Sequence, residues 1–215
     1  MEYITINFEV ADRYLPSYCS VAAIKWENDE IEDVFETYLY PDCEIESFFN
    51  NRHNITNKMV EQAPKLYDVW TELSQFIGEG PVFFVNGSKD IDALMQRVAV
   101  DNLACPDMEY GSIISLFKRT WSDKKLDKYT LPNMLHALEI DSKPYDATQD
   151  AISMGIIIRK AKEEQKVSSI QDLFNVTGYA CGVIISGRKY VCRAKKNKVR
   201  DYSARILLRI PFRAE

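Results

Sequence analysis

The first forty residues constrain the fold most strongly, because they hold three strand-like stretches separated by short polar segments. Apolar residues predominate in residues 2–10, in 20–26 ("SVAAIKW") and in 34–40 ("VFETYLY"). The polar residues "ENDE" at 27–30 leave only a short turn between the second and third stretches. This spacing predicts an antiparallel meander of strands.

Helical patterns follow these strands. Apolar residues form one stripe along 65–77, and "GEGP" ends that helix before a buried strand at 82–87. Further elements are expected as helices at 89–98, 111–120, 130–139 and about 146–164, and as a hairpin at 179–193. The mixture predicts an α/β fold with a mixed central β-sheet flanked by helices. We assign residues 1–165 to one domain and 166–215 to a small basic C-terminal extension.

Composition narrows the classes of protein and of metal site. The chain is 46% hydrophobic and 27% charged, as in soluble globular proteins. It contains no apolar run of 18 residues and does not begin with a secretory signal, so we expect no membrane span and a cytoplasmic location. Five cysteines without a C-x-x-C spacing and only two histidines argue against zinc. Carboxylates would therefore hold any metal ion, which points to Mg²⁺ or Mn²⁺.

Charge is distributed unevenly along the chain. Residues 186–215 carry ten Lys and Arg against two acids, whereas the first 185 residues carry a net charge of −13. Such asymmetry is found in chains that contact phosphates. A solvated basic surface segment is the equally weighted alternative.

Four acids stand at the ends of expected elements. Glu9 lies on the first strand and shares a face with Asn7, two residues earlier. Asp90 follows the strand at 82–87, and Asp150 lies one turn into the last long helix, near Asp146. Acids at helix N-termini also complement the helix dipole, and that interpretation stays open for the three aspartates. A half-buried acid on a core strand, such as Glu9, needs a partner.

The order of four short segments resembles the DEDD 3′–5′ exonuclease superfamily. The segments are "NFE" at 7–9, "HNIT" at 53–56, "VNGSKD" at 85–90 and "YDATQD" at 145–150. The nearest branch is the type of the proofreading epsilon subunit of bacterial DNA polymerase III, and the resemblance covers about residues 2–162. It implies an RNase H-like fold and metal-dependent phosphodiester hydrolysis.

The resemblance also assigns catalytic positions. It places the four metal-binding acids of the family at Asn7, Glu9, Asp90 and Asp150, and the general-base histidine at Tyr145. Glu9, Asp90 and Asp150 are thus the expected ligands of Mg²⁺ or Mn²⁺, and the neutral Asn7 is expected to weaken metal binding. Tyrosine is a poor base at neutral pH because its ordinary pKa is about 10. Two of the five positions therefore depart from the family pattern.

Substrate-binding positions follow from the same resemblance. It implies contacts with the terminal nucleotide at Phe8, Val10, His53 and Asn86, and a single-stranded DNA or RNA 3′ end as the partner. A surface loop for His53 and a turn for Asn86 are the open alternatives. A polymerase or another nucleic-acid-processing protein is a further possible partner.

Three functions remain in competition at this stage. The first is a degenerate exonuclease that binds single-stranded ends with hydrolysis weakened or lost. The second is an active metal-dependent 3′–5′ exonuclease, and the third is a protein-interaction module built on the exonuclease fold. Fold alone does not choose between them, so the site must decide.

Overall fold

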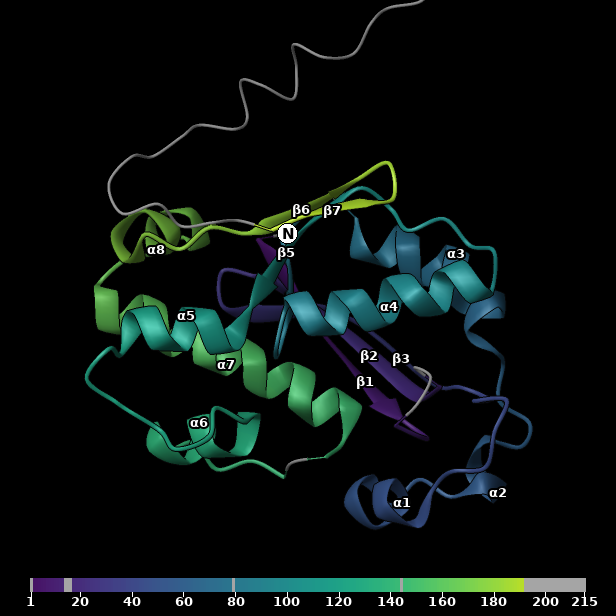
Figure 1. The fold of residues 1–215 in the computed structure, drawn as a ribbon. Coiled ribbons are helices and arrows are strands. Elements are labelled where there is room, and N and C mark those ends of the chain that lie inside the picture. The colour runs from purple at the N-terminus through teal and green to yellow at the C-terminus, as the bar shows by residue number, and fades with distance from the viewer. Residues whose placement is uncertain (1, 14–16, 79, 144, 192–215) are drawn as a thin grey trace, which may run out of the picture.

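The computed structural model describes residues 2–13, 17–78, 80–143 and 145–191. Its centre is a seven-stranded sheet with the strand order β3-β2-β1-β4-β5-β6-β7 (Figure 1). The strands are β1 (Tyr3–Val10), β2 (Tyr18–Glu27), β3 (Glu30–Tyr38), β4 (Val82–Phe84), β5 (Met108–Ser112), β6 (Gly182–Ile185) and β7 (Arg188–Tyr190). The helices are α1 (Ser47–His53), α2 (Asn57–Val60), α3 (Leu66–Ile77), α4 (Ser88–Val100), α5 (Ile113–Thr120), α6 (Leu131–Ala137), α7 (Ala147–Gln165) and α8 (Ile170–Thr177).

The sheet is mixed. β1, β2 and β3 form the antiparallel meander that the first forty residues predict. β4 then runs parallel to β1, and β5 runs parallel to β4. The hairpin of β6 and β7 completes the sheet, with β6 antiparallel to β5. The predicted α/β fold with a mixed central sheet is confirmed.

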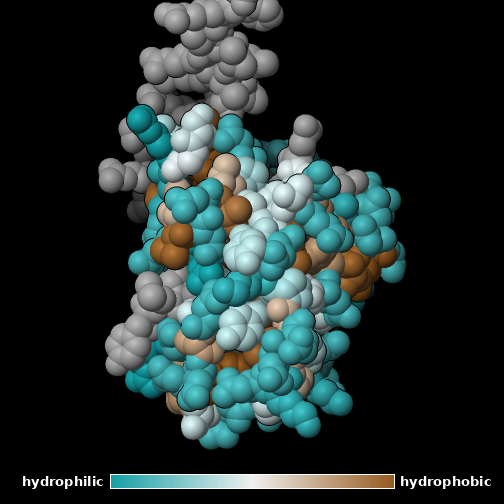
Figure 2. All heavy atoms as spheres, turned by 90° about the vertical axis from the view of Figure 1, so that its right-hand side faces the viewer, coloured by the Kyte–Doolittle hydropathy of each residue, from teal (hydrophilic) through white to brown (hydrophobic). Residues whose placement is uncertain are grey.

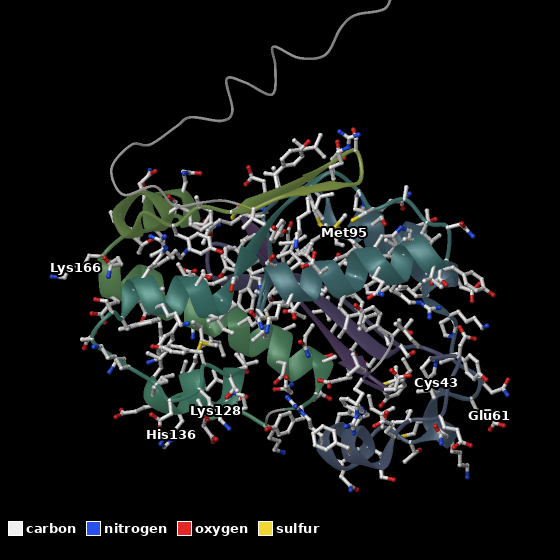
Figure 3. The ribbon with its side chains drawn as sticks, in the orientation of Figure 1. Cys43, Glu61, Met95, Lys128, His136 and Lys166 are labelled. Atoms are coloured by element: carbon white, nitrogen blue, oxygen red, sulfur yellow. The ribbon has the colours of Figure 1, made fainter. Side chains whose placement is uncertain are left out.

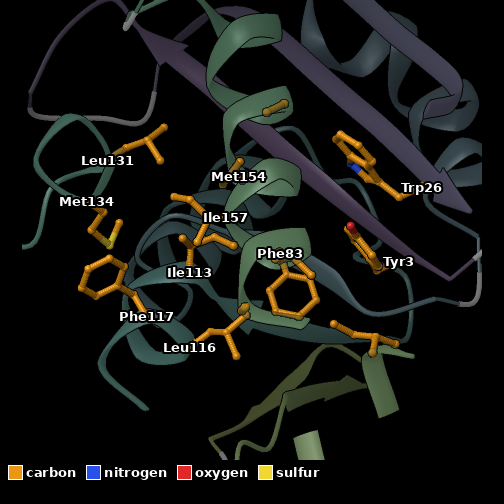
Figure 4. Close-up of a cluster of buried hydrophobic side chains, with 14 of the residues drawn as sticks. Tyr3, Trp26, Phe83, Ile113, Leu116, Phe117, Leu131, Met134, Met154 and Ile157 are labelled. Carbon is orange, nitrogen blue, oxygen red and sulfur yellow. The ribbon is translucent and has the colours of Figure 1, made fainter. Parts of the chain in front are cut away.

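Helices cover both faces of the sheet, and alternation along β1 decides which side chains each layer receives. Tyr3 joins the core formed with α5, α6, α7 and α8 (Figure 4). Ile4 and Ile6 point the other way and join the core formed with α3 and α4. The alternation places Asn7 and Glu9 on the same face as Tyr3, beneath α7.

Helix α7 packs unusually close to β2. A Cβ atom added at Gly155 would lie 2.0 Å from the Trp26 ring, so any larger residue would displace the helix or the ring. The ring is fixed in turn, because Trp26 Nε1 donates a hydrogen bond to Thr5 Oγ1 at 2.9 Å. This contact sets the height of α7 above the sheet, and with it the height of Asp150 one turn earlier.

The segment after residue 165 continues the same core. α8 packs beside α5 and α7, and β6 pairs with β5. Lys189 on β7 donates a hydrogen bond to Ser88 Oγ at 3.0 Å and forms an ion pair with Asp92, which ties the hairpin to the start of α4. Packing is therefore continuous across residue 165, the boundary expected from the sequence. The basic residues from 192 to 215 lie outside the described residues.

None of the helices that the structure describes combines the length and the apolar character needed to cross a bilayer. The surface in Figure 2 is mainly hydrophilic, with separated hydrophobic patches.

Candidate functional site

Asn7 and Glu9 lie side by side near the end of β1. Asn7 Nδ2 donates a hydrogen bond to Glu9 Oε1 at 3.2 Å. Asn7 is half-buried, while Glu9 is only 8% exposed. The same-face placement predicted from the strand is confirmed, and the amide stabilises the carboxylate as a hydrogen-bond donor.

Asp150 is brought to this pair by the first turn of α7. The side chain of Asp146 caps the helix by accepting the Gln149 N–H at 2.9 Å, so the helix axis begins at a fixed point. Asp150 is buried, and its Oδ1 accepts the backbone N–H of Tyr145 at 3.3 Å. The Asp150 carboxylate interacts electrostatically with that of Glu9.

Burial and like charge make both acids difficult to ionise. Burial raises the pKa of Glu9 to about 7, and the negative charge of Asp150 adds to this effect. Burial likewise raises the pKa of Asp150 to about 6, although the hydrogen bond from Tyr145 opposes the shift. The positive charge of Arg52 lowers both values. Glu9 and Asp150 therefore form a coupled acid pair that titrates close to neutral pH.

Asp90, the remaining acid that the resemblance assigns to the site, lies on α4 and not on β1 or α7. It lies in the first turn of α4, and its Oδ2 accepts the Asn86 N–H at 2.8 Å. Burial raises its pKa, and its negative charge in turn raises the pKa of Tyr18. Across the described ranges, no three His, Cys, Asp or Glu side chains are grouped so that they could hold a metal ion.

The turn before α4 explains where Asp90 and Asn86 lie. Gly87 has a φ of +56°, and a Cβ atom there would lie 2.6 Å from the Ser112 side chain on β5. Only glycine allows the chain to turn this tightly between β4 and α4. Asn86 is exposed beside that turn, and its backbone N–H donates the hydrogen bond to Asp90.

Tyr145 occupies the position expected for a general base, just before α7. Its backbone has a φ of +71°, which is uncommon for a bulky side chain. Its half-buried ring is covered by the Arg52 guanidinium, 4.4 Å from the ring centroid. The ring therefore stacks against a cation at the edge of the acid pair.

The expected substrate-binding residues near β1 have partners within the protein. Phe8 packs against Tyr18, with ring centroids 4.4 Å apart, and Val10 lies against the α3 and α4 side of the core. His53 is buried: its Nδ1 accepts the Ile55 N–H at 3.0 Å, and its Nε2 lies 3.1 Å from the Val10 carbonyl oxygen. Their contacts with substrate stay predictions.

His136 lies away from the acid pair. It is exposed on α6, and Figure 3 places it at the outer side of that helix.

Arg52 is the site residue that the sequence did not reveal. It lies in the last turn of α1, more than forty residues after Glu9 and more than ninety residues before Asp150. An exposed arginine in a short helix carries no recognisable signal by itself. Only the tertiary structure brings it over Tyr145.

Comparison with protein families gives the site its context. The model of the exonuclease family RNase_T matches residues 10–155, about two thirds of the chain. The chain belongs to this exonuclease family. The matched region begins one residue after Glu9, so the Asn7–Glu9 pair lies just outside it.

A curated relative of this exonuclease-family chain is the PolC-type DNA polymerase III of Latilactobacillus sakei subsp. sakei. It is 23% identical over 180 residues, which cover 81% of this chain and 12% of the relative. The chain thus spans about one eighth of the length of that polymerase.

Solved structures of nucleases share the fold. Cell-death related nuclease 4 superimposes with a TM-score of 0.70 at 14% identity, covering 89% of this chain and 81% of the nuclease. The nuclease domain of 3′hExo, a DEDDh family member bound to rAMP, superimposes with a TM-score of 0.64 at 17% identity, covering 77% of this chain and 92% of the nuclease domain. Exonuclease X in complex with 5′ overhanging duplex DNA superimposes with a TM-score of 0.58 at 16% identity, covering 82% of this chain and 99% of Exonuclease X.

Exonucleases of this family generally depend on divalent metal ions. Asn7 contributes a neutral amide whose nitrogen is turned toward Glu9. The Asp90 carboxylate accepts the Asn86 N–H through Oδ2, as Glu9 and Asp150 each accept one hydrogen bond. Glu9 and Asp150 are buried acids that interact with each other, and together they can balance the charge of a cation or of a hydrogen-bond donor.

Proposed function

We propose that this chain is an exonuclease-like protein that binds single-stranded 3′ ends and in which hydrolysis is weakened or lost. The observation that carries the proposal is the hydrogen bond from the Asn7 amide to Glu9. A carboxylate at this position would balance two cations, whereas an amide that donates to the neighbouring acid adds no negative charge. Mg²⁺ or Mn²⁺ would accordingly bind weakly.

The tyrosine at position 145 supports the same conclusion. The side chain at this position is a phenol stacked on the Arg52 guanidinium, in place of the imidazole that the family uses as its general base. The loss of a general base alone typically costs about 10²–10⁴ in rate. The two departures therefore affect both ion binding and proton transfer.

An active 3′–5′ exonuclease is the second candidate. It is favoured by the retention of Glu9 and Asp150 as a coupled pair with pKa values of about 7 and 6. In that case a single Mg²⁺ or Mn²⁺ ion would suffice for slow hydrolysis.

The partner follows from the same proposal. Among the structural neighbours, Exonuclease X is in complex with DNA, and a 3′-exonuclease recognises the 3′ end of a histone mRNA stem-loop. The PolC-type relative supports association with a polymerase as a further partner. We place the protein in the cytoplasm, in keeping with the free cysteines Cys19, Cys43, Cys105 and Cys181.

Restoring the two family residues tests the proposal. Asn7→Asp combined with Tyr145→His is expected to release nucleotides from a labelled single strand with Mn²⁺ at about 10² times the rate of the unmodified protein or faster. Asn7→Asp alone should restore Mn²⁺ binding and part of the rate. Tyr145→His alone should change little. Product release is measured on a denaturing gel, and Mn²⁺ binding by calorimetry.

Asn102→Asp is the matched control, because it adds the same charge at the exposed far end of α4. An unmodified protein as fast as the double variant would establish the second candidate. A double variant that binds Mn²⁺ but releases nothing would contradict decay at these two positions. The interaction-module hypothesis would then be preferred.

A further inference from the structure

Arg52 is the cation that acts on both members of the acid pair. Its positive charge lowers the pKa of Glu9 and of Asp150, which belong to different layers of the fold. The side chain is exposed, and its guanidinium lies 4.4 Å from the centroid of the Tyr145 ring. Arg52 thus links α1 to the loop that precedes α7, at the edge of the acid pair.

The position of Arg52 is set by its buried neighbour. Nδ1 of His53 accepts the Ile55 N–H at 3.0 Å, and Nε2 lies 3.1 Å from the Val10 carbonyl oxygen. Because Nδ1 accepts, Nε2 carries the proton and donates. Val10 directly follows Glu9, so these bonds fix the end of α1 beside the end of β1. The backbone of Arg52 is therefore held in place at the site.

The guanidinium of Arg52 keeps its donors available. Among the residues that the structure describes, no carboxylate forms an ion pair with it. Stacking on Tyr145 uses the face of the guanidinium and leaves its N–H groups at the edge, where they suit the geometry of a phosphate. An arginine that only neutralised Glu9 or Asp150 would be expected to form a direct ion pair with one of them.

The same face of α1 also carries an exposed aromatic ring. Phe48 is 61% exposed and lies four residues before Arg52, so the two side chains project from one side of the helix. Exposed aromatic rings next to cations are typical of single-strand binding surfaces, where bases stack and phosphates pair.

We propose that Arg52, held by stacking on Tyr145, binds the last internucleotide phosphate of a single strand at the acid pair, while Phe48 stacks on a base. This assignment rests on the proposed function, because it names the group that recognises the strand in that site. The positive charge comes from the protein itself. Strand binding should therefore persist in a metal chelator.

Binding in EDTA tests the assignment on the full chain. The probe is a short 5′-labelled oligothymidylate, compared with the same strand carrying a neutral methylphosphonate at the last internucleotide linkage. Arg52→Gln should weaken binding of the natural strand about tenfold, because a charge-assisted hydrogen bond is lost. The methylphosphonate should weaken binding to the unmodified protein by a similar factor, and binding to Arg52→Gln hardly at all.

Tyr145 variants test the stacking contact. Tyr145→Phe keeps the ring and should bind as the unmodified protein does. Tyr145→Leu should weaken binding about threefold and reduce the methylphosphonate effect, without lowering the melting temperature. Lys118→Gln is the matched control, because Lys118 is also an exposed cation over a tyrosine, 4.0 Å from the Tyr129 ring centroid, on a helix that contributes no site residue.

The outcomes separate this inference from the proposed function. Equal weakening by Arg52→Gln and Lys118→Gln, or an undiminished methylphosphonate effect in Arg52→Gln, would overturn the role of Arg52 and leave strand binding intact. An unmodified protein that does not bind the oligothymidylate would overturn both.

Discussion

Glu9 and Asp150 make the stability of the protein depend on pH. Burial raises the pKa of Glu9 to about 7 and that of Asp150 to about 6. In the unfolded chain both acids ionise near pH 4. Between pH 4 and 7 the folded state therefore binds more protons than the unfolded state. Because of this difference, the free energy of unfolding decreases as pH rises through that window.

A single substitution isolates this effect. Glu9→Gln keeps the shape of the side chain and cannot ionise, so it should leave stability nearly unchanged at pH 4. At pH 7.5 it should raise the free energy of unfolding by about 2–3 kcal/mol relative to the unmodified protein. Urea unfolding at several pH values measures the difference. If the free energies of unfolding of the two proteins changed in parallel with pH across the window, the surroundings of Glu9 would not disfavour its ionised form.

The site residues differ in how far the sequence reveals them. Strand alternation predicts that Asn7 and Glu9 share a face, and family resemblance brings Asp150 to them. The arrangement of Asp90 depends on the tight turn at Gly87, and that of Arg52 on the packing of α1 against β1. Both are consequences of tertiary contacts, which a local pattern does not encode.

At the scale of elements, the contact between α7 and β2 positions the acid pair. Gly155 lets the helix approach the Trp26 ring, and the hydrogen bond from Trp26 to Thr5 prevents the ring from moving aside. Alanine would normally stabilise a helix interior by about 1 kcal/mol relative to glycine. Here its Cβ atom would force the two elements apart.

We therefore expect Gly155→Ala to destabilise the protein by about 1–3 kcal/mol in spite of its better helix propensity. Trp26→Phe supplies the control, because a smaller ring leaves room for the added methyl group. The double variant should be more stable than the sum of the two single changes implies, as measured by urea unfolding. Strict additivity would show that the close approach is not the cause.

Elements with long periodic patterns were easier to predict than short ones. The three opening strands, the helices α3, α4 and α7, and the hairpin of β6 and β7 lie where the sequence indicates. β5 is not among the expected strands, because it has only five residues, "MEYGS", and includes a glycine. Helix α8 is not among the expected elements, although the Ser169 side chain caps it by accepting the Asp172 N–H.

For the whole molecule, charge separates an acidic body from a basic end. Residues 192–215 hold eight Lys and Arg against two acids, and they lie outside the described residues. The body contains the acid pair, which would repel a phosphate chain unless cations were close. Arg52 and the basic end are two sources of such positive charge. They differ in the number of charges and therefore in the salt dependence of the binding that they support.

Salt dependence distinguishes the two sources. Each phosphate contact on a single strand contributes about 0.7 to the slope of log affinity against log salt concentration. Deleting residues 192–215 should remove several phosphate contacts and reduce the slope by about 0.7 for each of them. Arg52→Gln removes one contact and should reduce the slope by about 0.7. Binding of a labelled oligothymidylate across a salt series gives both values. A deletion that leaves the slope unchanged would identify the basic end as a solvated segment, and strand binding would then depend on the α1 face alone.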